Sequence, residues 1–578
     1  MADLTVKKLK ERIRVARGEI PADLVLKKGR VLNVFSGTIE ESDVAVHEGI
    51  IVGIGAGYHG KEEVNARGKW IAPGFIDAHL HIESSMLLPS NLSAALLPHG
   101  TTAIIADPHE IANVLGLDGI RFLIRETESL PLDVFFMAPS CVPASLLETS
   151  GARLRASDLE QLKNEKRILG LAEVMNYPGV LTGDTDTLSK LALFKERIID
   201  GHSPSVSGFD LQAYVSAGVR SDHEASRREE GLEKVKAGMM LMIRESTAAM
   251  NLEALLPLVD ARNSRRFCFV SDDLHPQDIR DKGHLDHILR KAVSLGMDPV
   301  TAIQLVTLNP AEHFALRDRG AVSPGFRADL VVLRNLSHFE IERVYKDGRL
   351  VVDEGKLTST VGKKSRGLPS GNVNIPPITP TDFAIRRGGK KARVIQLVPG
   401  QILTRTCIEK VRTVNGLVLS DPGEDILKLA VIERHHGTGR IGLGLVKGFG
   451  LKQGALASTV AHDSHNLIVV GVEDGDLHRA ANELKKIGGG MVVVANGKVL
   501  AGVPLAIAGL LSREDLETVA GQVRELNFAA ANLGCVIPDP FMALSFLALP
   551  VIPELKLTDR GLVDVKNFTL VPLFIEDN

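Results

Sequence analysis

Residues 71 to 315 repeat one pattern, in which a short apolar stretch is followed by a polar loop and then by a helical stretch. Such alternation is typical of α/β proteins built on parallel strands. Eight strands in about 245 residues match a (β/α)8 TIM-like barrel, which we expect rather than an open doubly wound sheet, although alternation alone does not exclude the latter. The predicted strands are Ala72–His79, Thr101–Ala106, Val134–Ala138, Ile168–Val174, Ile198–His202, Val219–His223, Met239–Ile243 and Cys268–Ser271.

The segments on either side of this block differ from it. Residues 24 to 54 and 328 to 355 read as short strands separated by turns, without helical periodicity. We therefore predict one small β-sandwich domain built from both flanks. After a linker rich in Gly, Pro and Ser, we predict a separate α/β or α+β domain. The predicted boundaries are 1–70 and 316–361 for the two parts of the β-sandwich domain, 71–315 for the barrel, 362–380 for the linker and 381–578 for the C-terminal domain.

Composition excludes several classes of protein. Lys and Arg number 68 and Asp and Glu number 71, a formal charge of −3, so the chain has no overall basic field for nucleic acid. No apolar stretch is long and even enough for a membrane span, and the first residues, MADLTVKKLKERIRV, lack the apolar core of a signal peptide. The cysteines form no CxxC pair, which excludes a zinc ribbon. We expect a soluble cytoplasmic protein that binds neither nucleic acid nor a membrane.

Polar residues stand where the predicted strands end, which in a barrel is the mouth where active sites are built. Strand one runs into His79-Leu80-His81, and the imidazoles of an HxH pair lie on the same side of an extended strand, where both can bind one ion. A single histidine is more often an ordinary loop residue, but six candidate ligands at five strand ends indicate a metal site. They are His79, His81, Glu173, His202, His223 and Asp272, enough for two divalent ions if one carboxylate bridges them.

These residues also carry a resemblance to known proteins. The segment PGFIDAHLH at 73–81 resembles the strand-one signature of the amidohydrolase superfamily, and the β domain split between the two ends of the barrel is similar to that of the superfamily. Within it, the chain resembles the adenine deaminase family over nearly its whole length. The similar segments are HIESSM (81–86), ADPHEIANV (106–114), PSCVPA (139–144), GLAEVMNYPGV (170–180), DGHSP (200–204), SDHEA (221–225) and VAHDSHN (460–466).

The resemblance implies a metal centre. The superfamily places HxH on strand one, a bridging Lys or Glu on strand four, His on strands five and six, and Asp on strand eight, and the six candidate ligands occur in that order. Strand four, ILGLAEVMN, has no lysine and offers Glu173 as the bridging carboxylate, which disfavours the cyclic amidases that need a carboxylated lysine. The implied cofactors are two divalent ions, manganese or iron in this family, and the ligand set also suits zinc.

The implied activity is hydrolytic deamination of adenine to hypoxanthine and ammonia, a reaction of purine salvage. A metal-bound hydroxide would attack C6, and Asp272 would take its proton and pass it to the departing amino group. A second acid is needed near N1, for which Glu110 and Glu224 are candidates and Glu110 is favoured. We expect adenine and water as partners, and a homodimer or larger homo-oligomer.

Two other functions remain as alternatives. The first is another cyclic amidine or amide hydrolase, such as a guanine deaminase or a dihydropyrimidinase-like enzyme. The second is a non-catalytic scaffold that keeps the fold, which is disfavoured because all six ligand positions are filled.

Two further motifs resemble signatures of other kinds of site, and the sequence disfavours both. Residues 437–442, GTGRIG, match GxGxxG, but the Gly-rich stretch after them disfavours the helix that a dinucleotide site needs. His462-Asp463-Ser464-His465 contains residue types of a nucleophilic triad, yet residues so close in sequence rarely meet triad geometry. We expect this segment to structure a loop or, as the alternative, to reach the barrel mouth and help close the site.

Overall fold

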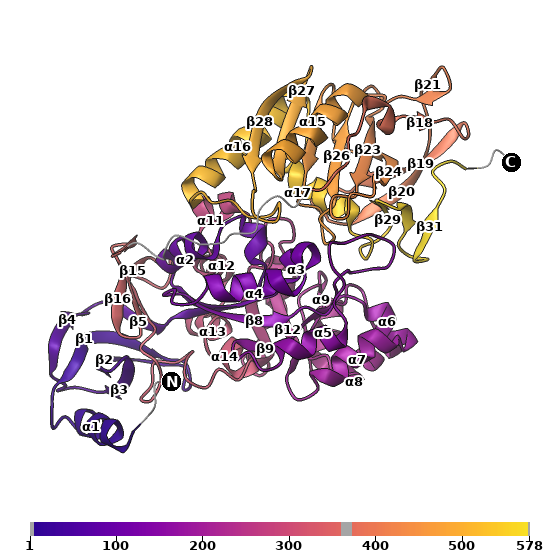
Figure 1. Ribbon diagram of the computed structural model, residues 1–578. Helices are drawn as coiled ribbons and strands as arrows, with labels where there is room; N and C mark the ends of the chain where they lie inside the picture. Colours follow the sequence, from indigo (N-terminus) through magenta and orange to yellow (C-terminus); the bar gives the residue numbers. More distant parts are fainter. Residues whose placement is uncertain (1–4, 360–372, 576–578) are drawn as a thin grey trace.

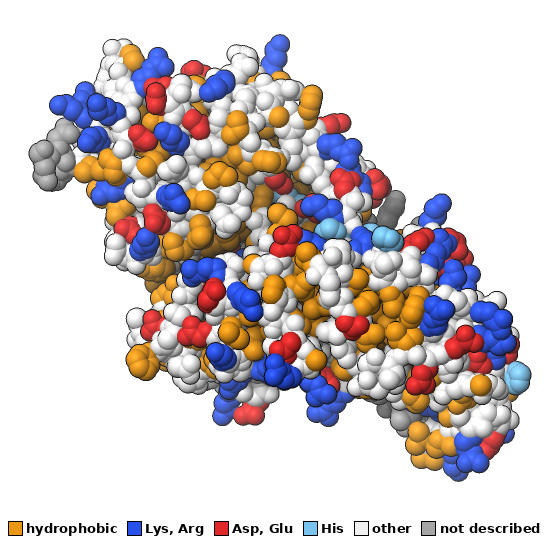
Figure 2. Space-filling model, turned by 180° about the vertical axis from the view of Figure 1, so that it is seen from behind, with side chains coloured by type: hydrophobic (Ala, Val, Ile, Leu, Met, Phe, Trp, Pro, Cys, Tyr) orange, Lys and Arg blue, Asp and Glu red, His pale blue; other side chains and the backbone are white. Residues whose placement is uncertain are grey.

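The computed structural model describes residues 5–359 and 373–575. It is mixed α/β, with parallel strands and helices in the middle of the molecule and mainly antiparallel sheets at its two ends (Figure 1). Of the linker predicted over 362–380, residues 362–372 lie outside the described residues. Among the helices described, none has the length and apolar character needed to cross a membrane. Acidic and basic side chains are interspersed on the face shown in Figure 2, as the small formal charge of −3 leads one to expect.

Strands from both flanks of the central block join one sheet, at the lower left of Figure 1. In the described chain this sheet has nine strands in the order β17-β16-β15-β14-β5-β1-β2-β3, with β4 paired to β1. Alternate residues of its strands point into a common core, as in a half-buried sheet. The strands are β1 Ala22–Asn33, β2 Thr38–His47, β3 Ile50–Ile54, β4 Gly60–Asn65, β5 Trp70–Pro73, β14 Leu330–Leu333, β15 Ile341–Lys346, β16 Arg349–Asp353 and β17 Lys356–Leu357.

The central block contains a strand at each of the eight predicted places. In the described residues these strands form two parallel sheets, ordered β10-β9-β8-β7-β6 and β11-β12-β13. The sheets adjoin at both ends, because the amide of Asp272 donates to His79 across 3.0 Å and the amide of Arg220 donates to Ile199 across 2.9 Å. The strands are β6 Phe75–Leu80, β7 Thr101–Ala106, β8 Asp133–Ala138, β9 Ile168–Val174, β10 Ile198–Gly201, β11 Ser221–Asp222, β12 Met240–Arg244 and β13 Phe267–Val270.

The first predicted strand, Ala72–His79, is divided in the structure. Its first residues belong to β5, which ends at Pro73 and pairs with β14 of the flank sheet, whereas β6 begins at Phe75. Gly74 stands at the junction, where a Cβ would lie 2.2 Å from Oγ1 of Thr102, so the close approach requires glycine. The prediction was wrong here because the apolar run continues through the junction.

Helices follow the strands of the central block and lie around it (Figure 1). In one of them Leu285, Ile288, Leu289 and Ala292 are buried, at the spacing of a single helix face. The helices are α2 Pro89–Leu96, α3 His109–Leu115, α4 Leu117–Glu126, α5 Ala156–Leu159, α6 Tyr177–Thr182, α7 Thr185–Leu193, α8 Gly208–Ser216, α9 Arg228–Lys236, α10 Leu252–Leu255, α11 Pro276–Lys282, α12 Leu285–Ser294, α13 Pro299–Leu305 and α14 Leu308–His313.

The C-terminal part, at the top of Figure 1, is built on an eight-stranded sheet, counted over the described residues, in the order β20-β19-β24-β23-β26-β25-β27-β28. Its strand β23 is buried along its whole length because α15 (Asp474–Ile487) packs on one face of the sheet and α16 (Leu516–Asn532) on the other. The other strands are β19 Lys391–Leu397, β20 Thr404–Lys410, β23 Ile426–Ile432, β24 Ile441–Lys447, β25 Ala455–Ser458, β26 Leu467–Gly471, β27 Gly490–Ala495 and β28 Lys498–Pro504, followed by α17 Pro540–Ser545 and a small sheet of β29 Leu555–Thr558, β30 Gly561–Asp564 and β31 Thr569–Val571.

The end of the predicted linker belongs to this C-terminal core. Val373, Ile375 and Ile378 are buried in the same apolar cluster as the inner face of α15. Composition indicated a linker because the segment is rich in Gly, Pro and Ser, but its apolar residues pack against the sheet.

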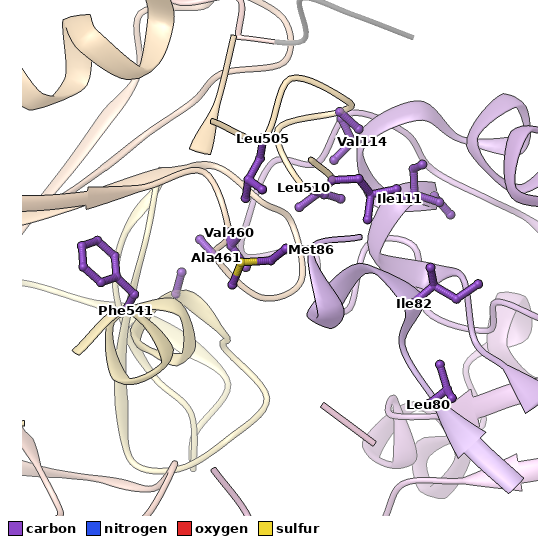
Figure 3. Packing of buried hydrophobic residues seen from close by; sticks show 14 of the residues in the cluster. Leu80, Ile82, Met86, Ile111, Val114, Val460, Ala461, Leu505, Leu510 and Phe541 are labelled. Atoms are coloured by element: carbon purple, nitrogen blue, oxygen red, sulfur yellow. The ribbon is translucent and has the colours of Figure 1, made fainter. Parts of the chain in front are cut away.

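The C-terminal part shares a hydrophobic core with the carboxyl ends of β6 and β7. Figure 3 shows Met86, after β6, lying beside Val460 and Ala461 of the C-terminal part. The amide of Ser512 donates to the carbonyl of Met86 across 2.7 Å, so backbone pairing reinforces the apolar contact. The C-terminal part is thereby held over the strand ends where the candidate ligands stand.

Candidate active site and metal centre

The six predicted ligands come together at the carboxyl ends of the central strands, and each is less than a tenth exposed. They reach this point from different elements of the two parallel sheets. His79 lies in β6, His81 directly after it, Glu173 in β9, His202 after β10, His223 after β11 and Asp272 after β13.

Glu173 lies between two pairs of imidazoles. Its Oε1 is 3.4 Å from Nε2 of His81 and 3.9 Å from Nε2 of His79. Its Oε2 is 2.6 Å from Nδ1 of His202 and 3.2 Å from Nε2 of His223. One carboxylate therefore faces one histidine pair with each oxygen, which is the arrangement of a bridging ligand.

Asp272 adds a second carboxylate on the β6 side. Its Oδ1 lies 3.4 Å from Nε2 of His79 and 3.3 Å from Nε2 of His81. Asp272 has a φ of 56°, in the left-handed region that is uncommon for residues other than glycine. The hydrogen bond from its backbone amide to the carbonyl of His79 holds this conformation.

The donor atoms fit divalent ions. Nδ1 of His81 lies 3.2 Å from the carbonyl of Asp107 and can only donate to it, which leaves a lone pair on Nε2. That lone pair faces carboxylate oxygens of Glu173 and Asp272, and two acceptors face each other stably when a cation binds both. Nε2 of His79 is buried without a hydrogen-bond partner in the described chain, so it too is available as a ligand.

Neighbouring aspartates position the histidines. Oδ1 of Asp77 accepts the amide of His79 across 3.2 Å, and its Oδ2 accepts the hydroxyl of Ser271 across 2.6 Å. The same D-x-H spacing recurs after β7, where Oδ1 of Asp107 accepts the amide of His109 across 3.0 Å. The carboxylate thus closes a local turn that aims the following imidazole into the site.

His223 is positioned by a buried ion pair beneath it. Asp222 accepts a hydrogen bond from Nζ of Lys234 across 2.7 Å and another from the amide of Ala225 across 2.9 Å. Burial raises the pKa of Asp222, but the charge of Lys234 outweighs it and lowers the pKa to about 2. The carboxylate therefore stays ionised and holds the turn that carries His223.

Arg244 at the end of β12 connects two acids of the site. Its Nη1 donates to Asp272 Oδ2 across 2.8 Å, and both of its terminal nitrogens donate to the carboxylate of Glu224. Burial raises the pKa of Glu224, but the charge of Arg244 outweighs it, so the pKa lies below its ordinary value. Glu224 is thus an ionised partner of an arginine.

Glu110, predicted as an acid, contacts the C-terminal part instead of standing alone. Its Oε1 lies 2.7 Å from Nδ1 of His462, and its Oε2 contacts Nε2 of His465. Nearby, Glu83 is buried, and desolvation together with the charge of Glu110 raises its pKa to about 7. The segment around His462 therefore reaches the mouth, which was the alternative rather than the favoured reading of that motif.

Sequence reasoning missed two residues of the site. His109 lies 3.6 Å from Glu173 and 3.7 Å from Asp463 (Nδ1 to Oε1 and Nε2 to Oδ2), and the D-x-H spacing it shares with His79 is the signal that could have revealed it. No local pattern marks the other, Arg244.

A cavity of about 30 Å³ lies between the strand ends and the C-terminal part. Its floor includes His81, Glu173 and Asp272. Its roof comes from the C-terminal part, with Ile402, His462, Asp463, Phe546, Leu549 and Ile552. The volume admits about one water molecule.

Comparison with known proteins gives a consistent family. Residues 70–351 match the Amidohydrolase family, and residues 401–569 match the Adenine deaminase C-terminal domain. The adenine deaminase of Desulfatibacillum aliphaticivorans is 50% identical over 97% of this chain and 99% of its own. That of Methanothrix thermoacetophila is 48% identical over 98% and 100%, and adenine deaminase 2 of Carboxydothermus hydrogenoformans is 47% identical over 98% and 100%. Among solved structures, a β-aspartyl dipeptidase of Fervidobacterium islandicum AW-1 aligns with a TM-score of 0.44 at 17% identity, over 58% of this chain and 98% of its own.

Proposed function

The chain belongs to the adenine deaminase family of amidohydrolase enzymes, and from this premise we propose that it hydrolyses adenine to hypoxanthine and ammonia at a centre of two divalent ions. The observation that carries the proposal is the position of Glu173, with one oxygen toward His79 and His81 and the other toward His202 and His223.

We propose that the eight central strands close into one (β/α)8 barrel over 71–315, with a β-sandwich domain formed from 1–70 and 316–361 and the C-terminal domain over 381–578. The backbone bonds at both junctions of the two parallel sheets support closure, since Asp272 pairs with His79 and Arg220 with Ile199. The single sheet that contains strands from both flanks supports the split β domain.

The ions would be held by His79, His81, Glu173, His202, His223 and Asp272. The family favours manganese or iron, and the types of ligand also suit zinc. Ions bound there supply Lewis acidity that lowers the pKa of a water toward neutrality. Glu173 lies between the two histidine pairs, and the buried surroundings exclude bulk water.

Asp272 and Glu110 are the proposed acid–base groups. Asp272 takes the proton of the attacking water and transfers it to N6 as the C6–N6 bond breaks. Each carboxylate oxygen has two lone pairs, so Oδ2 keeps one for this proton while it accepts from Arg244. Glu110, which also lines the cavity, serves the protonation of the ring nitrogen N1. The cavity of about 30 Å³ is smaller than a purine, so adenine needs more room than this structure offers between the strand ends and the C-terminal part.

The test is to remove metal from the purified chain, reconstitute it with Mn²⁺, add adenine and measure ammonia. We expect adenine to be converted, adenosine to fail because its ribose collides with the pocket, and guanine to fail because its exocyclic groups leave buried polar groups unpaired. Comparable rates on guanine or on a cyclic amide would move the chain to one of the other amidohydrolase activities.

A further inference from the structure

The loop at 459–466 of the C-terminal part enters the mouth of the central block. Oγ1 of Thr459 donates to the carbonyl of Gly509 across 2.8 Å, which holds one end of the loop. His462 and Asp463 line the same cavity as the predicted ligands His81 and Glu173. The imidazole of His462 and the carboxylate of Asp463 have no role in the mechanism above.

The ring of His462 is held on two sides. Its Nδ1 lies 2.7 Å from Oε1 of Glu110, and its face stacks on Phe546 with ring centres 4.5 Å apart and an angle of 18° between the planes. Its side chain is 5% exposed. Nε2 of His462 has no hydrogen-bond partner within residues 5–359 and 373–575, so one nitrogen is anchored and the other is free to meet a ligand in the cavity.

Glu110, His462 and His465 lie close enough to hold an ion, but the tautomer of His465 argues against it. The amide of Ala461 donates to Nδ1 of His465 across 3.2 Å, so Nδ1 is an acceptor and the ring hydrogen is on Nε2. Nε2 therefore carries the ring hydrogen on the side of Oε2 of Glu110 and has no lone pair for a metal. Glu110 is a carboxylate that faces two imidazole N–H groups.

This anchoring changes which group can reach a substrate. Both oxygens of Glu110 face histidines of the C-terminal loop, and both oxygens of the other candidate acid, Glu224, bind Arg244. His462 lines the same cavity as Glu110, and its Nε2 is not engaged by Glu110, which contacts Nδ1.

We propose that His462, contributed by the C-terminal part, is a catalytic acid that protonates N1 of adenine from Nε2 while Glu110 orients it through Nδ1. The assignment rests on the proposed function. As the water oxygen bonds to C6, the N1–C6 π pair moves onto N1 and takes the Nε2 proton. Asp272 moves the hydroxyl proton to N6, ammonia leaves, and N1–H remains in hypoxanthine. The first proton of the water reprotonates His462, so protons balance over the cycle.

The surroundings of His462 favour the charged ring at neutral pH. Burial lowers the pKa of His462, but the charge and hydrogen bond of Glu110 outweigh it and raise the pKa to about 9. A carboxylate that orients one imidazole nitrogen while the other faces the substrate is an established arrangement for proton transfer.

The test uses His462→Asn in the full chain loaded with Mn²⁺. The Asn amide can replace Nδ1 as donor to Glu110 but has nothing at the place of Nε2. We expect kcat for adenine to fall about 10²–10⁴-fold, with KM changed far less and metal content retained. A kcat within about threefold of the original would overturn the assignment.

A matched control separates chemistry from docking of the C-terminal part. Nε2 of His436 contacts the carbonyl of Ser150 across 3.0 Å, at the same interface but outside the cavity. His436→Gln should therefore keep kcat within about threefold. If His462→Asn also loses metal or thermal stability, His462→Ala decides. Recovery of kcat with added imidazole supports the assignment, and no recovery overturns it. An unaltered chain that releases no ammonia from adenine overturns the proposed function itself.

Discussion

Nη1 of Arg244 donates a hydrogen bond to Oδ2 of Asp272 across 2.8 Å. The contact turns the other oxygen, Oδ1, toward Nε2 of both His79 and His81. The ends of β6, β12 and β13 therefore jointly set the orientation of one carboxylate. An acid held in this way can bind an ion with one oxygen and handle a proton with the other.

Asp272→Asn keeps the size of the side chain but removes its basic oxygen. We expect a loss of kcat of at least about 10²-fold while most of the metal remains, since five other ligands are untouched. Activity assays with elemental analysis check this. Asp273→Asn is the control. Asp273 also lines the cavity, but its carboxylate accepts a hydrogen bond from the hydroxyl of Ser84 across 2.5 Å, so this variant should lose less activity. The opposite order would make Asp273 the base.

Glu173→Gln should break the metal pair. The amide has one neutral oxygen and cannot bridge two cations, so we expect metal content to fall from about two ions per chain to about one, with loss of activity. Chelator dialysis of the unaltered chain, followed by stepwise return of Mn²⁺, should restore activity in proportion to the second ion. Full turnover at one ion per chain would make Glu173 an ordinary ligand.

The stability of the fold at acid pH should depend on Asp133. Its carboxylate forms an ion pair with Nζ of Lys346 across 2.7 Å and another with Arg319. Burial raises the pKa of Asp133, but the charges of Lys346, Arg319 and Arg327 outweigh it and lower the pKa to about 2, below the ordinary 3.8. A lowered pKa stabilises the fold above the ordinary value, and this contribution, on the order of 2 kcal/mol, is lost as pH falls toward the folded-state pKa.

Asp133→Asn should therefore lower the urea midpoint at neutral pH and make it less sensitive to pH between about 5 and 2. The exposed Asp118 of α4 provides the control, and Asp118→Asn should change neither quantity. An equal acid sensitivity in the original chain and Asp133→Asn would contradict the prediction.

Docking of the C-terminal part should depend on Asp559. It accepts the amide of Thr149 across 2.9 Å and the hydroxyl of Thr149 across 2.7 Å, joining the loop after β8 to the segment after β29. Asp559→Ala leaves these donors unpaired, a cost of about 1–3 kcal/mol. Thermal unfolding should show it. Asp564→Ala removes only local hydrogen bonds from the amide and the side chain of Asn567, so it should cost less, and an equal or larger loss there would refute the role of Asp559.

Local periodicity was enough to predict most of the elements. The strand predicted over Thr101–Ala106 is β7, and the strand predicted over Ile168–Val174 is β9, each with the predicted bounds. The failures lie where a single residue interrupts a uniform pattern, as Gly74 does between β5 and β6. Its effect comes from Thr102 on another strand, which no local window contains.

The sequence by itself determined the six candidate ligands, because a metal site needs particular donor types and these stand at the ends of recognisable strands. Only the tertiary structure decided what surrounds them. Glu110 and His462 are 352 residues apart, and Arg244 lies 28 residues from Asp272, so each pairing arises from packing and leaves no mark at fixed spacing. Which residue types are present is a property of the chain, whereas which atoms share a proton depends on distances that are set only when the strands pack together and the C-terminal part packs on their ends.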